Sequence, residues 1–271
     1  MAGLQTKDFR YTVPSLIALA LFTVFMFPTM GAIQLAMDEN VVYWFGRWIL
    51  ICLVVPFLLL WQYWYHSVKT GGQAKKVVIL ACVLIPCLIF FFSGVVLLFQ
   101  GSHLFRDLAS PHCQDFEEIR GLEASYRDAK EFHACCLKRA GVFEAAPHCS
   151  DPHVPMGVHE GSFMTIQHCD GYHSMLADHR EDWEYLRFLE DNNGCTGFCN
   201  PEWTAMWSVI LSPRDGCAHA AASVVEGKVM HIGWQFTCYA PVVFMAYVIW
   251  SFLVPFGQQP PAGRMLKAES A

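Results

Sequence analysis

The sequence predicts an all-α membrane protein: four transmembrane helices with a large, mainly helical, disulfide-rich extramembrane domain between spans three and four. Two observations lead to this prediction. Of the 271 residues, 54% are hydrophobic and only 15% are charged, and the apolar residues gather in four blocks. Eight of the 12 cysteines lie together between the third block and the fourth.

Each apolar block is long enough to cross a bilayer. About 20 apolar residues, at a rise of about 1.5 Å per residue, span a hydrocarbon core about 30 Å thick. The third block has 23 residues without a charge, which disfavours a helix buried in a soluble protein. The predicted spans are Val13–Leu35, Val41–Trp64, Val77–Phe99 and Gly233–Phe256.

The first two spans each need a comment. The first is too long for the apolar core of a secretory signal and lacks a small-residue cleavage site, so we expect an uncleaved anchor. Arg47 lies near the start of the second, where its side chain can reach the headgroups. The membrane core of this span is therefore predicted from Trp48 to Trp64.

Basic residues predict the orientation, because cytoplasmic connections are enriched in Lys and Arg. The linker 66–76 carries three Lys and no acid, and Arg264 and Lys267 follow the last span. Both termini are therefore expected on the inner, cytoplasmic side. The predicted organisation is an inner tail (1–12), three spans with short connections (13–100), an outer domain (101–231), a fourth span (232–256) and an inner tail (257–271).

The outer segment 101–231 is acidic, with 10 Lys or Arg against 20 Asp or Glu. Such a field disfavours nucleic acid as a partner. The expected partners are the lipid bilayer and other membrane proteins, with homo-oligomerisation left open. No N-x-[ST] sequon occurs in the chain. The expected location is the plasma membrane or an endomembrane, and other organelle membranes stay open.

Cysteine usage in the outer segment predicts disulfides. An even count beyond a membrane favours cross-links, because that compartment is usually oxidising. Two of the eight cysteines are adjacent and cannot bond each other without strain, so we expect them to reach different partners. The sequence does not give the connectivity. The predicted disulfide cysteines are Cys113, Cys135, Cys136, Cys149, Cys169, Cys195, Cys199 and Cys217.

Histidines offer a second interpretation, because 11 of the 12 lie in the same outer segment. Imidazole and thiolate are ligands that Zn²⁺ prefers. The candidate ligands are His148, His153, His168, Cys169 and His173. No paired CxxC or HExxH motif supports a metal site at these residues. We therefore favour a solvated, His-rich loop whose charge responds to pH, and we expect no cofactor.

Apolar periodicity predicts helices in the outer domain. Steps of three and four residues indicate an amphipathic helix or helix pair within Asp115–Phe143. Residues 144–173 show no apolar periodicity, which predicts an irregular loop. A second helix is predicted from Ser174, as N-cap, to the Asn192-Asn193-Gly194 stop signal.

Two more helical segments are predicted before the last span. A short helix begins at Asn200, with a proline at its first position. It places on one side Trp203, Met206, Trp207 and Ile210, which we expect in the core. The stretch Ala218–His231 is expected to be helical and to run into the fourth span.

The layout resembles that of the tetraspanin family. The features that carry the resemblance are four spans, a basic inner linker, a large loop before the last span, the Cys135-Cys136 pair and Gly216-Cys217. Leu137 replaces the glycine of the family's CCG motif, and no clear P-x-S-C follows. The resemblance implies a bond from Cys135 to Cys217. It also implies a bond from Cys136 to Cys199 or, as second choice, Cys149.

No nucleophile, phosphate-binding or dinucleotide motif is present, so an enzyme is not expected. The spans carry almost no ionisable residues, which disfavours transport. The leading hypothesis is a tetraspanin-like scaffold that binds partner proteins through its outer loop and its spans. The alternatives are an accessory subunit of a large organelle membrane complex and a His-rich protein that binds metal or responds to pH.

Overall fold

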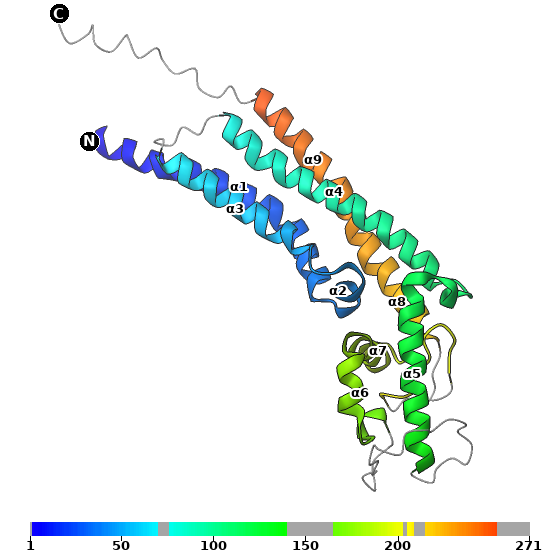
Figure 1. Ribbon diagram of the computed structural model, residues 1–271. Coiled ribbons are helices and arrows are strands. Elements are labelled where there is room, and N and C mark those ends of the chain that lie inside the picture. The colour runs from blue at the N-terminus through cyan, green and yellow to red at the C-terminus, as the bar shows by residue number, and fades with distance from the viewer. Residues whose placement is uncertain (1, 70–75, 140–164, 203–204, 209–214, 254–271) are drawn as a thin grey trace, which may run out of the picture. The chain divides into compact units, whose positions relative to one another are not determined.

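The computed structural model describes residues 2–69, 76–139, 165–202, 205–208 and 215–253, which are helical or irregular and include no strand (Figure 1). The chain divides into two compact units. The apolar unit contains Met1–Gln34, Trp48–Val96 and Ile232–Ala271. The disulfide unit contains Leu35–Arg47 and Leu97–His231.

Long apolar helices build the apolar unit. They are α1 (Ala2–Met37), α3 (Leu50–Lys69), α4 (Lys76–Leu108) and α9 (His231–Leu253). Four stretches are long and apolar enough to cross a membrane, at Ser15–Met37, Leu50–Lys69, Val78–Leu108 and Cys217–Ile249. The prediction of four spans is confirmed at this level, and the chain is a multi-pass membrane protein.

The predicted second span starts too early. In the structure a separate short helix, α2 (Glu39–Phe45), ends at Gly46, and α3 begins only at Leu50. Gly46 has φ +69° and ψ −168°, a conformation that favours glycine and stops the helix. Val41 and Phe45 are therefore buried in the disulfide unit and do not extend the span.

Small residues allow close packing in the apolar unit. A Cβ added to Gly94 of α4 would lie 2.5 Å from Thr237 Oγ1 and 2.7 Å from the Gly233 carbonyl oxygen of α9. At Gly31 of α1 it would lie 3.3 Å from an Ile232 side-chain carbon. Small residues at such contacts let membrane helices approach closely, so α9 packs against both α1 and α4.

A tyrosine compensates for a proline in α1. Pro28 has no N–H, so the Val24 carbonyl four residues earlier lacks its helical donor. The hydroxyl of Tyr239 on α9 donates a hydrogen bond to that carbonyl. Because unsatisfied backbone groups are costly in hydrocarbon, this bond stabilises α1 and joins it to α9.

Shorter helices form the disulfide unit. They are α5 (Glu117–Arg139), α6 (Tyr172–Asp178), α7 (Arg180–Asn193) and α8 (Cys217–Val224), with 3-10 turns η1 (Cys113–Asp115) and η2 (Ile166–His168). The core between α5 and α7 includes Ile119, Leu122, Ala129, Leu186 and Leu189, each at most 2% exposed.

Outer-domain helix predictions are confirmed in part. The amphipathic helix is present as α5, and residues after 139 of that prediction lie outside the described ranges. Ser174 does not cap a helix. The helix starts at Tyr172 after Gly171, whose φ is +88°, and His179 separates α6 from α7. Gly194, at φ +62°, ends α7 as predicted.

The helix predicted from Asn200 is wrong wherever the structure describes it, because 200–202 and 205–208 are irregular. Met206 and Trp207 are nevertheless buried, as expected, while Trp203 and Ile210 lie outside the described residues. Residues 144–164 of the predicted irregular loop also lie outside them; the rest contains η2 and the start of α6.

Helix α8 continues without a break into α9, as predicted for Ala218–His231. The connecting turn η3 (Val225–Met230) is a π-helix. Side chains of η3 pack against α4. A Cβ added to Gly101 of α4 would lie 3.4 Å from Met230 and 3.5 Å from Val229. The close approach at Gly101 fixes the end of α4 within the disulfide unit.

Candidate interaction site

Within the described residues, three disulfides cross-link the disulfide unit. They join Cys113 to Cys199, Cys136 to Cys169 and Cys195 to Cys217. Cys135 is disulfide-bonded as well, and Cys149 lies outside the described residues.

The pairing implied by the tetraspanin resemblance is wrong for this chain. Cys217 bonds Cys195 instead of Cys135, and Cys136 bonds Cys169 instead of Cys199 or Cys149. The local backbone explains why Cys195 reaches α8. The Cys217 N–H donates to Gly197 O at 2.8 Å, so the turn after α7 lies directly against the start of α8.

Glycine is required in that turn. Gly197 has φ +71°, and a Cβ there would lie 1.9 Å from the Asn200 carbonyl oxygen. A Cβ on Gly216 would lie 2.8 Å from the Phe198 carbonyl oxygen. Only glycine permits this approach, which brings Cys195 beside Cys217.

Trp183 is the centre of an aromatic cluster in the disulfide unit. It is fully buried, and its indole N–H donates to Ser125 O at 3.0 Å. The rings of Tyr172 and His179 stack on it at centroid distances of 5.8 and 5.4 Å, and Trp207 lies edge-on at 6.4 Å. This cluster packs α6, α7 and the 205–208 segment together.

A polar and aromatic contact joins α2 to α7. We call it the α2–α7 seam and define it by Asn40, Tyr43, Trp44, Asp182 and Tyr185. The rings of Tyr43 and Tyr185 stack at 3.9 Å with an angle of 6° between their planes. The Tyr43 hydroxyl donates to Asp182 Oδ1 at 2.8 Å.

Hydrogen bonds extend the seam on both sides. Trp44 Nε1 donates to the Tyr185 hydroxyl at 2.7 Å, and that hydroxyl donates to Asn40 Oδ1 at 3.2 Å. Burial raises the pKa values of Tyr43 and Tyr185, so both hydroxyls stay protonated donors at physiological pH. Ser125 of α5 donates to Asp182 Oδ2 at 2.6 Å, which connects the seam to α5.

An ion pair also holds α2 in place. Lys228 of η3 contacts Asp38 Oδ2, while Asp38 Oδ1 accepts the Asn40 N–H at 3.1 Å and so caps α2. Sequence reasoning missed this contact and the seam because Val41–Phe45 was assigned to a span. The signal was present in Asp38 as an N-cap followed by tyrosine, tryptophan and asparagine.

Glu190 is a buried carboxylate, 1% exposed, near the end of α7. It accepts the backbone N–H groups of Met206 at 3.0 Å and Trp207 at 2.8 Å. Burial raises its pKa to about 7, although these hydrogen bonds act in the opposite direction. Sequence reasoning missed its role.

Histidine candidates for a metal are not brought together in the described part of the chain. Cys169 is in a disulfide, and His168 Nδ1 lies 2.8 Å from Thr165 Oγ1. His173 is exposed, and its ring lies edge-on to Tyr172. His148 and His153 lie outside the described residues, within which no group of three potential ligands occurs.

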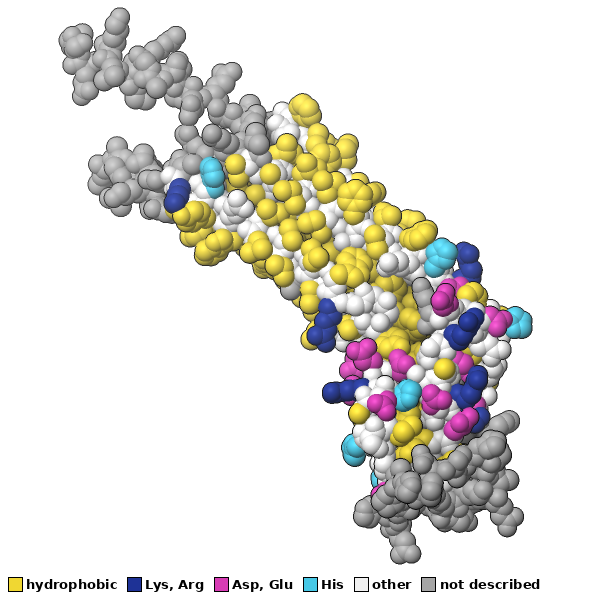
Figure 2. Space-filling view, viewed as in Figure 1, with side chains coloured by type: hydrophobic (Ala, Val, Ile, Leu, Met, Phe, Trp, Pro, Cys, Tyr) yellow, Lys and Arg dark blue, Asp and Glu magenta, His cyan; other side chains and the backbone are white. Residues whose placement is uncertain are grey.

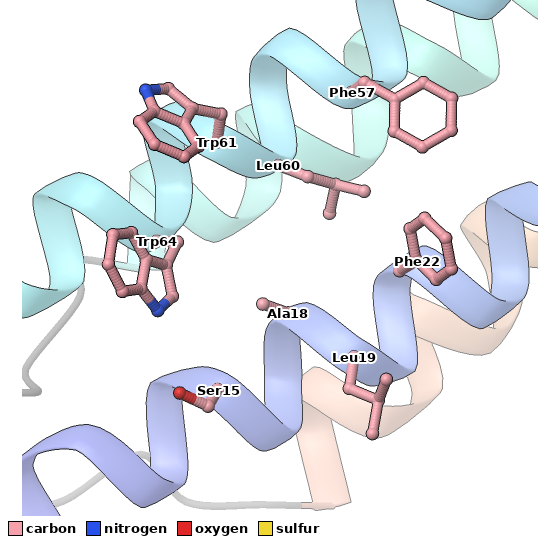
Figure 3. A pocket seen from close by; sticks show the side chains of 8 residues that line it. All are labelled: Ser15, Ala18, Leu19, Phe22, Phe57, Leu60, Trp61 and Trp64. Carbon is pink, nitrogen blue, oxygen red and sulfur yellow. The ribbon is translucent and has the colours of Figure 1, made fainter.

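An apolar groove runs between α1 and α3 (Figure 3). The only side-chain polar groups in its lining are the Ser15 hydroxyl and the indole N–H groups of Trp61 and Trp64. Its chemistry suits acyl chains or an apolar helix. The lining residues are Ser15, Ala18, Leu19, Phe22, Phe57, Leu60, Trp61 and Trp64.

The surfaces of the two units differ in chemistry, as Figure 2 shows. Within the described residues of the disulfide unit, Met37 and Phe99 are the only large hydrophobic side chains that are exposed. The apolar unit exposes them along all four of its helices. Contacts on the two surfaces must therefore use different forces.

Comparison with known proteins identifies no relative: no family model, no curated protein and no solved structure matches the chain.

Proposed function

We propose that this protein is a tetraspanin-like membrane scaffold that binds other membrane proteins through its outer loop and its spans. The observation that carries the proposal is the pairing of four apolar helices with a separate disulfide-bonded unit, into which the connection between the first two spans is built through the α2–α7 seam. A rigid unit of this kind suits protein recognition.

The orientation of the scaffold follows from chemistry. Disulfides persist in oxidising compartments, so the disulfide unit faces the extracellular space or an organelle lumen. Both termini and the Lys-rich linker then face the cytoplasm, as the distribution of basic residues favours.

Polar groups inside the apolar unit support a structural role for the spans. The Cys52 thiol lies 3.2 Å from Ser93 Oγ, and the Tyr239 hydroxyl bonds the Val24 carbonyl. These groups hold helices to each other, as polar residues often do in membranes. The lipid-facing side chains are apolar and available to partner helices.

Two contact modes follow from the two surfaces. On the disulfide unit recognition is polar and salt-sensitive, because among its described residues only Met37 and Phe99 are exposed large hydrophobic side chains. In the bilayer, recognition of partner helices depends on how closely the helix surfaces fit each other, since lipid is as apolar as the helices.

Cross-linking in native membranes tests the proposal. The full chain is tagged, cross-linked, purified and analysed by mass spectrometry, alongside Glu181→Lys on α7 and, as control, Glu131→Lys on α5; both glutamates are exposed. Specific membrane proteins should be recovered, and Glu181→Lys should lower their recovery more than the control variant does. Recovery of an uncross-linked monomer only would overturn the proposal, and one fixed stoichiometric complex would favour the accessory-subunit alternative.

A further inference from the structure

The strongest unexplained feature is the buried carboxylate of Glu190. It lies on the inner stripe of α7, four residues after Leu186 and seven after Trp183, where apolar side chains are expected. A carboxylate at a 1% exposed position has lost nearly all of its hydration. Other interactions of the carboxylate must compensate for this lost hydration.

Glu190 holds the irregular segment 205–208 in the core. Its carboxylate accepts the N–H groups of Met206 and Trp207, and on the other side the Met206 carbonyl accepts the Ile166 N–H at 2.8 Å. The segment is thereby fixed between α7 and η2, and it delivers Trp207 to the Trp183 cluster.

The groups that face Glu190 provide no positive charge. No Lys, Arg or His forms an ion pair with it in the described part of the chain. Asp191 adjoins it on α7 and adds repulsion. Tyr126 of α5 is electrostatically coupled to Glu190. The carboxylates of Glu190, Glu123 and Glu202 all raise the pKa of the Tyr126 hydroxyl.

The other acidic groups that act on Tyr126 have partners of their own. Glu202 pairs with Lys130 at 2.6 Å, and Glu123 Oε2 accepts the Cys199 N–H at 3.2 Å. The Tyr126 hydroxyl interacts with the Gly197 backbone, and the Trp207 indole interacts with Tyr172, so neither group supplies a donor to Glu190. The negative charge of Glu190 is therefore stabilised chiefly by backbone N–H groups.

We propose that Glu190 is a proton-linked clamp of the disulfide unit: in mildly acidic surroundings it takes up a proton, which removes the buried charge and makes the fold around the 205–208 segment more stable. The unit is then more resistant to opening in an acidic lumen than at a neutral cell surface. This regulation goes beyond the scaffold role and does not depend on the identity of any partner.

The direction follows from the two states of the carboxyl group. Folding raises the pKa of Glu190 from its ordinary 4.5 to about 7, so between these values the folded state binds more protons than the unfolded state. Stability therefore rises as pH falls from about 7 to about 4.5. Most paired surface carboxylates have the opposite effect, because acid removes the charge that stabilises them.

Hydrogen–deuterium exchange on the full, disulfide-bonded chain in lipid nanodiscs tests the clamp. The amides of Met206 and Trp207, corrected for intrinsic exchange rates, should be about 10- to 50-fold better protected at pH 5.0 than at pH 7.4. In Glu190→Gln, which keeps an acceptor oxygen but cannot titrate, this pH dependence should disappear. Glu131→Gln, at an exposed position of α5 that does not act on Glu190, should keep it.

Two results would overturn the proposal. One is a pH dependence that persists unchanged in Glu190→Gln, and the other is equal protection of the wild-type amides at both pH values. If Glu190→Gln fails to fold, ¹³C NMR titration of the wild-type Glu190 carboxyl carbon decides. A midpoint near 7 supports the clamp, and a midpoint near 4.5 contradicts it.

Discussion

Different interactions hold the helices together in the apolar unit and in the disulfide unit. In the apolar unit, helices approach through Gly31 and Gly94, and a tyrosine satisfies a carbonyl left free by proline. In the disulfide unit, covalent bonds, an aromatic cluster and buried hydrogen bonds hold short helices and irregular segments together. Lipid supplies no hydrophobic force between helices, so close backbone contact replaces it there.

The comparison predicts that the largest effect comes from breaking a covalent link. Cys195→Ser with Cys217→Ser should lower the free energy of unfolding of the disulfide unit by about 2–5 kcal/mol. Chemical denaturation of the purified chain, followed by tryptophan fluorescence, measures this loss. Cys238→Ser, which removes an exposed free thiol, is the control and should leave the transition unchanged.

Close packing in the apolar unit predicts the next effect. Gly94→Ala places a Cβ 2.7 Å from a backbone oxygen, so α4 and α9 must separate, at a cost of about 1–3 kcal/mol. Gly121→Ala on α5 meets open space and should be neutral or stabilising. Thermal stability in nanodiscs distinguishes them, and equal melting temperatures would show that the α4–α9 approach is not tight.

The α2–α7 seam predicts a comparable loss confined to the disulfide unit. Tyr185→Phe removes one hydroxyl and leaves Trp44 Nε1 and Asn40 Oδ1 without their partner, at about 1–3 kcal/mol. Hydrogen exchange should show faster opening of α2 with little change in α3. Unchanged protection of α2 would mean that the seam is not what holds this helix.

The smallest effect is expected at the proline-compensating bond. Tyr239→Phe leaves the Val24 carbonyl without a donor, and polar contacts between membrane helices contribute about 0.5–2 kcal/mol. Tyr65→Phe on α3 is a control for the loss of a tyrosine hydroxyl. A melting temperature lowered for Tyr239→Phe alone supports the assignment, whereas equal effects of the two variants would refute it.

The four spans could be predicted because a span depends mainly on length and apolar composition. The start of the second span could not, because the apolar residues of α2 resemble membrane residues until the contact with α7 is known. Cysteine pairing failed for a related reason: it depends on the backbone turn through Gly194 and Gly197, which brings Cys195 to α8.

Glu190 shows a different limit. Its spacing from Trp183 and Leu186 placed it on the buried side of α7, a signal that the sequence does contain. Its partners, however, are backbone N–H groups of a segment for which a helix was predicted. Only the irregular course of 205–208 leaves those N–H groups free to bind a carboxylate.

Disulfide mapping tests the central claim, that covalent cross-links hold the disulfide unit together. The full chain is digested without reduction, directly from native membranes with free thiols blocked, and the linked peptides are identified by mass spectrometry. The structure predicts Cys113–Cys199, Cys136–Cys169 and Cys195–Cys217. Free thiols at these positions, or a bond between Cys135 and Cys217, would contradict it.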